Sequence, residues 1–388
     1  MAVSWRESTW GAEVSLEYGK ALRGHSTSTG KYRVFGSNGA IGWTNESLAD
    51  GPGVILGRKG AYRGVEYSRE PFFVIDTAYY VVPKTPTDMR WLFYAIKHHK
   101  LGEIDDGSPI PSTTRAAVYV KNLMVPSIEE QRAIAGILGT LDDKIELNRR
   151  TNETLEAMAS ALFKSWFVDF DPVRAKAAGK KPSGMDAETA ALFPSELVES
   201  EMGDIPKGWP LGSLGTVMEL KRGYDLPQGD RREGQVPIVS SGGHSGFHHE
   251  AMARAPGIVT GRYGTIGRVF LVREDFWPLN TTLYVRDLKG SDVFFAYHLL
   301  QTIDFRKFSD KAAVPGVNRN DLHEEPVIVP PRTVQAKFGE IAALQINLTS
   351  TNKSQTAVLA QIRDALLPRL LSGELTIPNA ERIAGIAR

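Results

Sequence analysis

The residue range 125–170 constrains the fold most, because its sequence predicts one long helix. It starts with VPSIEEQRAIAGIL and contains no proline between Ser127 and Asp171. Its apolar residues recur at alternating steps of four and three, which is the heptad spacing of a coiled coil. The seam consists of Ile134, Leu138, Leu141, Ile145, Leu155, Ala159, Leu162 and Trp166. Such a helix would be about 60 Å long at ~1.5 Å per residue, which is longer than one small domain needs.

A second copy of this helix follows 204 residues later. Asn148 then corresponds to Asn352, and the second helix is expected from about Arg332 to Leu371. Pro368 lies near its end, so we expect the last turn to be kinked or broken. Because each apolar seam needs a partner, we expect the two helices to pair as an antiparallel coiled coil.

The predicted helix pair has a polar position at its middle and apolar residues outside its seam. In an antiparallel pair Asn148 would lie near Asn352, where buried amides cost stability but fix the register. Phe163, Phe167 and Leu367 fall off the seam, so we expect them on outer faces that another protein could cover. The alternative is a helical hairpin that has no further partner.

The 204-residue offset also holds outside the helices, which indicates a tandem duplication. Gly57-Arg58 aligns with Gly261-Arg262, and the range 72–81 aligns with 276–285. This period is too long for a solenoid. Each copy shows short apolar runs separated by Gly-rich turns and then a helical segment, so the predicted fold class is α+β.

The duplication predicts a domain order along the chain. The expected parts are a mixed domain at 1–124, a long helix at 125–170, a linker at 171–208, a second mixed domain at 209–328, a second long helix at 329–373 and a tail at 374–388. The linker is rich in Ala, Lys, Glu and Pro, and we expect one short helix in it with Asp186 as N-cap. It is either a disordered tether or an ordered segment that wraps along the helix pair.

Composition limits the class of protein. The chain has no cysteine, so neither a disulfide nor a thiolate metal site is possible. It has no run of 18 apolar residues and no signal-like N-terminus, so we expect a soluble, cytoplasmic protein without membrane contact. A formal net charge of +1 does not predict strong non-specific DNA binding, although one face can still be basic.

No catalytic motif is recognisable in the sequence. The carboxylates are scattered, and no Asn/Asp-Pro-Pro-aromatic segment of an amino methyltransferase is present. His244, His248 and His249 lie near Glu250, but without cysteines a polar loop is favoured over a metal site. We therefore expect no catalytic residues, no metal and no cofactor in this chain.

A basic loop flanked by glycines recurs in both copies, at residues 57–63 and 261–268. Glycine allows close approach of the backbone, arginine can bind a guanine edge with two hydrogen bonds, and lysine or arginine can neutralise phosphates. We therefore predict DNA contact, the alternative being a solvated hairpin tip. Predicted DNA-binding residues, including polar loop neighbours, are Arg58, Lys59, Tyr62, Arg63, Arg115, Ser241, His244, Arg262, Tyr263, Arg268 and Arg319.

Several segments in order give the chain a resemblance to a known family. They are VPSIEEQRAIAGIL, LFKSWFVDFDPVRAKAAGKKPSGMDAETAALFP, EMGDIPKGW and LLPRLLSGEL. Together with two mixed domains and two long helices, they resemble the specificity subunit of a type I restriction-modification system over essentially the whole chain. One departure is Val334, which stands where the first copy has Glu130, so not every contact is symmetric.

The resemblance implies a division of labour. The domains at 1–124 and 209–328 would be target-recognition domains that each read one half of a bipartite sequence in double-stranded DNA. The helices would act as a ruler between the half-sites and bind two methyltransferase subunits, and restriction subunits can join. Adenine N6 methylation and DNA cleavage, with S-adenosylmethionine, ATP and Mg, would belong to those partners.

The leading hypothesis is thus a non-catalytic reader of DNA sequence that scaffolds other subunits. A single-chain DNA methyltransferase or nuclease with an unrecognised active site is the alternative from the enzyme class. A protein-only adaptor is a third possibility, and it would not bind a specific duplex in a salt-dependent way.

Overall fold

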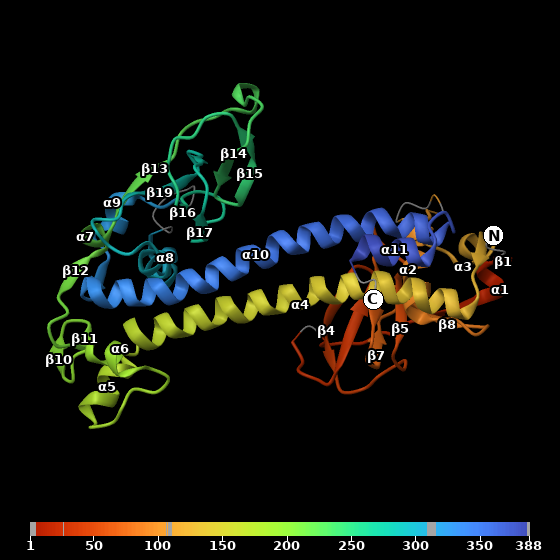
Figure 1. The fold of residues 1–388 in the computed structure, drawn as a ribbon, viewed down its shortest axis with the longest axis horizontal. Helices are drawn as coiled ribbons and strands as arrows, with labels where there is room; N and C mark the ends of the chain where they lie inside the picture. Colours follow the sequence, from red (N-terminus) through yellow and green to blue (C-terminus); the bar gives the residue numbers. More distant parts are fainter. Residues whose placement is uncertain (1–4, 26, 106, 108–110, 309–315, 386–388) are drawn as a thin grey trace. The chain divides into compact units, whose positions relative to one another are not determined.

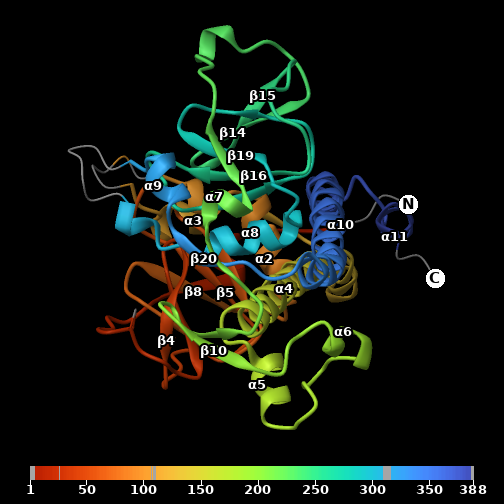
Figure 2. The same cartoon turned by 90° about the vertical axis from the view of Figure 1, so that its left-hand side faces the viewer.

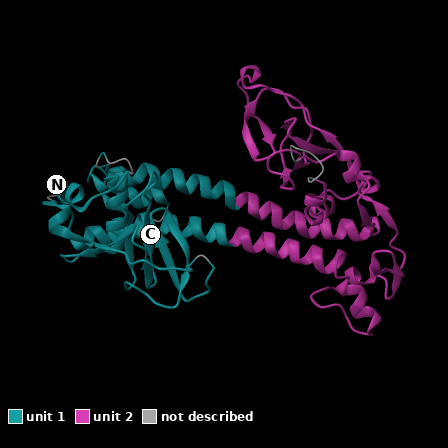
Figure 3. Cartoon of the chain, turned by 180° about the vertical axis from the view of Figure 1, so that it is seen from behind, with its two compact units in different colours: residues 1–150, 352–388 teal, residues 151–351 magenta. Residues whose placement is uncertain are grey.

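A computed structural model of the 388-residue chain describes residues 5–25, 27–105, 107, 111–308 and 316–385. The chain forms two compact units, residues 1–150 with 352–388 and residues 151–351 (Figure 3). Both unit boundaries fall within the long helices, so each unit contains part of each helix. Among the described residues, no helix has the length and apolar character needed to cross a membrane.

The first unit contains a mixed domain built on two small sheets. The sheet orders are β2-β8-β5-β6 and β4-β3-β7, and β1 pairs with β9. The strands are β1 (Arg6–Thr9), β2 (Val14–Tyr18), β3 (Tyr32–Gly36), β4 (Gly39–Thr44), β5 (Gly53–Gly57), β6 (Val65–Ser68), β7 (Phe72–Val74), β8 (Ala78–Pro83) and β9 (Asn122–Val125). The helices of this domain are α1 (Trp10–Glu13), α2 (Met89–His98), the 3-10 helix η1 (Leu101–Glu103) and α3 (Arg115–Tyr119). The central strand β5 is buried along its whole length, as its unbroken apolar run predicts.

The second unit repeats this order of elements. Its sheets are β13-β19-β16-β17 and β15-β14-β18, and β12 pairs with β20. The strands are β12 (Leu211–Ser213), β13 (Glu219–Arg222), β14 (Val236–Ser240), β15 (Gly243–His248), β16 (Gly257–Gly261), β17 (Val269–Val272), β18 (Trp277–Pro278), β19 (Thr282–Asp287) and β20 (Pro326–Ile328). The helices are α7 (Leu214–Val217), η2 (Gln228–Asp230), α8 (Val293–Thr302), η3 (Phe305–Phe308) and α9 (Arg319–His323).

Strand register confirms the tandem duplication. Leu56 pairs with Tyr79 across β5 and β8, and Thr260 pairs with Leu283 across β16 and β19. The two pairs are related by the same offset of 204 residues that relates Asn148 to Asn352. Since a slip of one residue would turn every side chain to the opposite face, the shared register keeps corresponding residues on corresponding surfaces. The predicted α+β class is confirmed.

The two predicted long helices are α4 (Ile128–Phe167) and α10 (Arg332–Leu371), each 40 residues long. A capping box starts α4, because Ser127 Oγ accepts from the Glu130 N–H while the Glu130 carboxylate accepts from the Ser127 N–H. Val334 cannot do the same for α10 and is instead buried. The helix α10 continues past Pro368 to Leu371, so of the two expected outcomes the break does not occur, and the kink stays a prediction.

The helices pack side by side and antiparallel within each unit (Figures 1 and 2). In the first unit, the Asn148 side-chain amide donates to the Asn352 carbonyl at 3.4 Å and to Gln355 Oε1 at 2.9 Å. Apolar seam residues of both helices flank this polar position and join the core of the first domain. The role of the asparagines in fixing the register stays a prediction.

In the second unit, the helix pair is closed by aromatic residues. Phe163 and Phe167 are buried, and each has its ring centroid within 5.5 Å of the Phe338 centroid. The expectation that both lie on an outer face is therefore wrong. Helix α8 packs over that face through Phe295, which a heptad count on α4 alone could not reveal.

The segment between the copies is ordered, which decides between the two alternatives for the linker. It contains α5 (Asp171–Ala177), α6 (Ala187–Ala191), β10 (Leu197–Ser200) and β11 (Gly203–Pro206), and the tail contains α11 (Ile377–Ala384). Asp186 caps α6 as predicted, by accepting from the Thr189 N–H at 2.6 Å. Phe193 is buried against Trp166 and anchors the segment to the end of α4.

Candidate nucleic-acid interface

The same backbone frame supports both predicted basic loops. In the first unit, the N–H groups of Arg58 and Lys59 donate to the Thr77 carbonyl, and the Arg58 carbonyl accepts from the Thr113 N–H at 2.9 Å. In the second unit, Thr281 accepts in the same way from the N–H groups that follow Gly261. A Cβ on Gly57 would lie 2.2 Å from the Ser37 carbonyl oxygen, so only glycine allows the two backbone segments to approach this closely.

The corresponding frame of the second unit presents different side chains. Arg262 and Tyr263 follow Gly261, and the Arg262 guanidinium stacks on the Tyr263 ring at 4.5 Å. Arg268 is exposed and stacks on Phe270 at 5.0 Å.

In the first unit, two predicted arginines converge on one tyrosine. The guanidinium carbons of Arg58 and Arg115 lie 4.9 Å and 4.2 Å from the centroid of Tyr18. Arg58 also donates to the Asp76 carbonyl at 2.9 Å, and Arg115 pairs with Glu17 at 3.4 Å. Sequence reasoning missed Tyr18, because only the pairing of β2 with β8 brings it to these loops.

The other predicted residues of the first loop have contrasting environments. Lys59 and Tyr62 are exposed, Tyr62 to 78%. The Arg63 guanidinium instead donates to three backbone carbonyls, those of Gly60, Gly102 and Ile104. It also donates to Thr113 Oγ1 at 3.1 Å. These four bonds hold the loop in place, and the predicted contact of Arg63 with DNA stays a prediction.

The remaining predicted residues of the second unit are spread over several loops. His244 is exposed and lies edge-on to Phe247 at 4.7 Å between ring centroids. Ser241 is fixed by its N–H, which donates to Thr281 Oγ1 at 3.4 Å. Arg319 is exposed as the first residue of α9, and its counterpart Arg115 is the first residue of α3.

A further basic group in the second unit was not predicted. Lys221 stands where the first unit has Glu17, and its Nζ donates to the Tyr224 hydroxyl at 3.0 Å. Tyr224 in turn lies 3.1 Å from the Tyr284 hydroxyl. These hydrogen bonds from Tyr284 and Lys221 lower the pKa of Tyr224, whereas burial raises the pKa of Tyr284. Lysine in place of glutamate makes this surface more positive than its counterpart.

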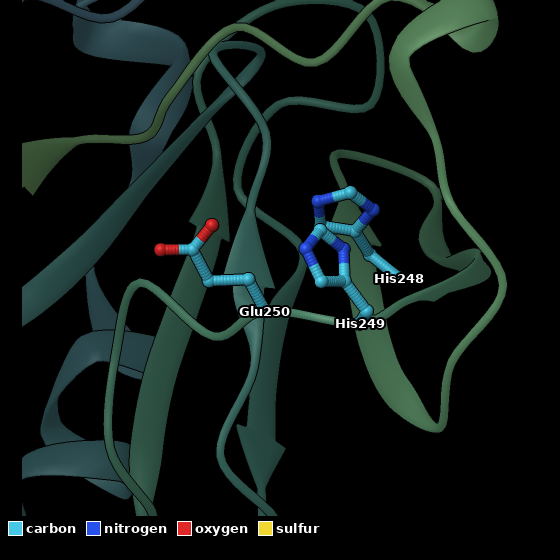
Figure 4. A group of neighbouring side chains, drawn as sticks. All are labelled: His248, His249 and Glu250. Atoms are coloured by element: carbon cyan, nitrogen blue, oxygen red, sulfur yellow. The ribbon is translucent and has the colours of Figure 1, made fainter.

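Three potential metal ligands gather at the end of β15. His248, His249 and Glu250 offer ligand atoms within 4.8 Å of one another (Figure 4). His248 is buried, however, and its Nδ1 accepts from the Arg232 N–H at 3.1 Å. Its ring also packs edge-on against Trp277 at 5.1 Å. Packing and hydrogen bonding explain His248 without an ion, and the expectation of no metal stays a prediction.

A glutamine near the start of each long helix holds the mixed domain on that helix by hydrogen bonds. The Gln131 side chain accepts from the Asp88 N–H at 2.9 Å and donates to the Pro126 carbonyl at 3.1 Å. Gln335 makes the corresponding bonds to Asp292 and Pro330 in the second unit. Both glutamines are buried, and Asp88 and Asp292 are the N-caps of α2 and α8. Each glutamine thus fixes the first turn of a domain helix against the start of a long helix.

Comparisons with known proteins agree with this architecture. The family described as "Type I restriction modification DNA specificity domain" matches residues 17–157 and 206–363. The specificity subunit of type I restriction enzyme MjaIX from Methanocaldococcus jannaschii is 27% identical over 325 residues, covering 76% of this chain and 71% of the relative. The HindI specificity subunit from Haemophilus influenzae is 28% identical over 330 residues, covering 68% and 71%.

A solved structure shares the fold. The S subunit of a type I restriction-modification system from M. genitalium aligns with a TM-score of 0.68 at 19% identity. The alignment covers 95% of this chain and 96% of that chain. The two family matches coincide with the two copies of the duplication, and together they span most of the sequence. The chain therefore belongs to the type I restriction-modification specificity family, as a non-catalytic specificity subunit with two DNA-recognition domains.

Proposed function

We propose that the chain reads a bipartite target in double-stranded DNA, one half with residues 1–124 and the other with residues 209–328. The observation that supports this most directly is the repeated loop frame, in which corresponding backbone hydrogen bonds present Arg58-Lys59 in one unit and Arg262-Tyr263 in the other. Phosphate contacts position a protein on DNA, whereas side chains at base edges specify sequence. A conserved frame with exchanged side chains suits that separation of tasks.

The long helices are the proposed scaffold for two methyltransferase subunits and, where present, restriction subunits. Both helices expose apolar side chains away from the pair, Leu147 on α4 and Val358 on α10 in the first unit. Met158 on α4 and Leu344 and Leu348 on α10 do the same in the second unit, with Leu344 71% exposed. Leu344 and Leu348 are four residues apart and so lie on one face of α10, where the apolar face of a partner helix could pack.

The chemistry is assigned to the partner subunits. We propose that they carry out adenine N6 methylation with S-adenosylmethionine, and DNA cleavage with ATP and Mg where a restriction subunit takes part. The specificity subunit contributes sequence recognition and assembly, and it acts in the cytoplasm with the DNA. This assignment suits a chain whose basic and aromatic groups gather on the recognition domains, on loops and on the ends of strands and helices.

The proposal is tested by expressing the chain with its methyltransferase partner and mapping methylated adenines in the host genome. We expect one bipartite motif with the complex and no methylation by the specificity chain alone. Arg262→Ala should alter one half of the motif only, because a bidentate arginine contributes about 1–3 kcal/mol of discrimination at its base. Methyl transfer by the isolated chain, or methylation without sequence preference, contradicts the proposal.

A matched control separates recognition from general loss of charge. Lys207 lies in the ordered linker and pairs with Glu196 at 2.6 Å, with 61% of its side chain exposed. Lys207→Ala removes one cation from the same chain and should leave the methylated motif unchanged. A motif that changes equally in Lys207→Ala and Arg262→Ala would show that net charge, and not the loop, sets the specificity.

A further inference from the structure

At the exposed end of β2, one tyrosine contacts the guanidinium groups of two arginines. Tyr18 is 47% exposed, yet the guanidinium groups of Arg58 and Arg115 both lie within 5 Å of its ring centroid. The three residues come from β2, the loop after β5 and the first position of α3. Two positive charges therefore lie close together. The negative face of the Tyr18 ring and the nearby Glu17 carboxylate offset their repulsion.

The ring itself is held in place from below. Tyr18 packs on Tyr79 with 5.1 Å between ring centroids, and the Tyr79 hydroxyl donates to the Thr113 carbonyl at 3.2 Å. Both arginines also lie 5.9 Å from the Tyr79 centroid. Burial and the neighbouring Tyr18 raise the pKa of Tyr79 to about 12, so this support stays uncharged at physiological pH. The tyrosine pair is thus a platform for two cations.

A hydrogen bond or an ion pair anchors one nitrogen of each guanidinium. Arg58 donates through Nη1 to the Asp76 carbonyl, and Arg115 pairs through Nη2 with Glu17. The Nε of Arg115 is shielded from solvent and has no hydrogen-bond acceptor among the described residues. Intramolecular contacts therefore orient these groups without using all of their donors, in contrast to Arg63, which has four acceptors.

Among the described residues of the second domain, this arrangement is absent. At the position of Tyr18 the duplication places Arg222, and at the position of Glu17 it places Lys221. Arg222 lies 3.8 Å from Asp225, and no aromatic ring among the described residues stacks on it. The platform is therefore a property of the first domain and concerns only the half-site that this domain reads.

We infer that Tyr18 is a positioning residue that holds Arg58 and Arg115 as one two-arginine group for a guanine in the half-site read by the first domain. The inference deepens the proposed function and rests on it. Guanine is the favoured ligand because its O6 and N7 accept two parallel bonds from one guanidinium, and a guanidinium whose plane is fixed loses less freedom on binding. A phosphate can also accept two bonds from one guanidinium, but such a contact is independent of sequence, so the two ligands differ in whether binding depends on the base.

The test uses the full chain in complex with its methyltransferase partner. Adenine methylation is mapped genome-wide, and binding to the mapped duplex is measured beside duplexes in which each guanine of either half-site is replaced. We expect Tyr18→Ala to weaken binding to the mapped duplex about tenfold, as loss of two cation–π contacts implies. It should also relax the preference for guanine at one position of one half-site, while Tyr18→Phe, which keeps the ring, retains both.

Controls separate positioning from folding. Phe93→Leu removes a ring stacked under Lys97 at 5.1 Å on α2 of the same unit, and it should leave guanine preference unchanged. In a double-mutant cycle, Arg58→Ala should cost less affinity when Tyr18 is already alanine than in the native chain. If Tyr18→Ala destabilises the chain, this coupling is measured in the Tyr18→Leu background.

The outcomes distinguish the inference from the function on which it rests. If the native complex shows no bipartite motif, the proposed function fails. If the motif is present but Tyr18→Ala lowers binding equally for all duplexes, the arginines contact phosphates and the inference is overturned. Equal losses for Tyr18→Phe and Tyr18→Ala, or independent effects of Tyr18 and Arg58 in the cycle, overturn it as well.

Discussion

The two recognition domains are held on the long helices by the same hydrogen bonds but by different packing. Gln131 and Gln335 make corresponding bonds in the two units. Beside them, the first unit places Tyr94 and Asp142 at the junction, and the duplication places His298 and Ile346 at the corresponding positions. One junction is therefore polar and charged, whereas the other is aromatic.

The polar junction is a small network centred on two aspartates of α4. The Tyr94 hydroxyl donates to Asp142 at 2.6 Å, and Arg363 of α10 donates to the other oxygen of Asp142 at 2.7 Å. Arg90 donates to Asp143 and to the Gly139 carbonyl. Hydrogen bonds from Arg90 hold the pKa of Asp143 below its usual range. Such a junction depends on geometry and charge.

The aromatic junction depends on burial. Phe338 of α10 contacts Phe163 and Phe167 of α4, and His298 of α8 stacks on Phe163 at 5.7 Å. Both copies of the duplication keep the glutamine that pairs with backbone groups, because a buried backbone group without a partner is costly. The surrounding side chains were free to change, because apolar contacts and ion pairs can each fill the same space.

The largest expected effect comes from opening the aromatic junction. Phe338 is fully buried, so Phe338→Ala should lower the free energy of unfolding by about 3–5 kcal/mol through lost burial and a cavity. Native-state hydrogen exchange should then accelerate in α8 and not in α2. Leu344→Ala, an exposed site on the same helix, should change stability by less than about 0.5 kcal/mol. Equal acceleration in both domain helices would argue against two independent junctions.

Acid should weaken the aromatic junction next. Burial lowers the pKa of His298 to about 4, and its Nε2 has no hydrogen-bond partner among the described residues. The unfolded chain, with a pKa near 6.5, binds more protons between these values, so stability is full above about pH 6.5 and falls as the pH drops toward 4. The loss should approach ~3 kcal/mol at the acid end.

A variant isolates this histidine from other titrating groups. Burial raises the pKa of Asp292, the N-cap of α8, which gives a contribution of opposite sign near its own pKa. Urea unfolding of the native chain and of His298→Phe at pH 4.5 and 7.5 therefore compares two proteins that share Asp292. Between pH 7.5 and pH 4.5 the free energy of unfolding of the native chain should fall relative to that of His298→Phe. A difference in this free energy that does not depend on pH would mean that burial does not hold His298 neutral.

The polar junction should respond to one substitution that leaves the aromatic junction intact. Asp142→Asn removes the charge that faces Arg363 and weakens the acceptor of the Tyr94 hydroxyl. Hydrogen bonds to charged groups contribute about 1.5–3 kcal/mol, so we expect a loss near 2 kcal/mol. The loss should shrink in 1 M salt, where ~3 Å screening weakens the native ion pair. Hydrogen exchange localised to α2 and α4 checks this, and faster exchange in α8 would contradict it.

The sequence could predict the parts of this fold that depend on periodicity. The heptad seam and the repeated residues gave the span of α4 to within three residues at each end and that of α10 from Arg332 to Leu371. The Asp186 cap followed from local chemistry. These features depend on residues that lie near one another in the chain, or on a repeat that can be read directly.

Features that depend on contacts between distant residues could not be predicted in the same way. Phe163 and Phe167 lie off the seam, and only the packing of α8 shows why they are buried. Tyr18 precedes Arg58 by 40 positions, and pairing of β2 with β8 brings them together. Arg63 lies in a basic loop yet binds backbone carbonyls of the η1 region. In each case the residue type indicated the kind of interaction, but the sequence did not show which distant residue would be the partner.

The smallest expected effect concerns one matched pair of surface contacts. Arg69 pairs with Asp143 in the first unit, and its counterpart Arg273 donates to Asn347 in the second. Arg69 is 60% exposed and Asp143 43%, so Arg69→Ala should cost at most about 1 kcal/mol, and less in high salt. Arg273→Ala removes a bond to a neutral amide, so its smaller cost should not depend on salt. Denaturant midpoints of both variants at 0.05 M and 1 M salt measure this difference directly. A salt response in Arg273→Ala as large as that in Arg69→Ala would show that both junctions are governed by the general field of the protein rather than by their individual partners.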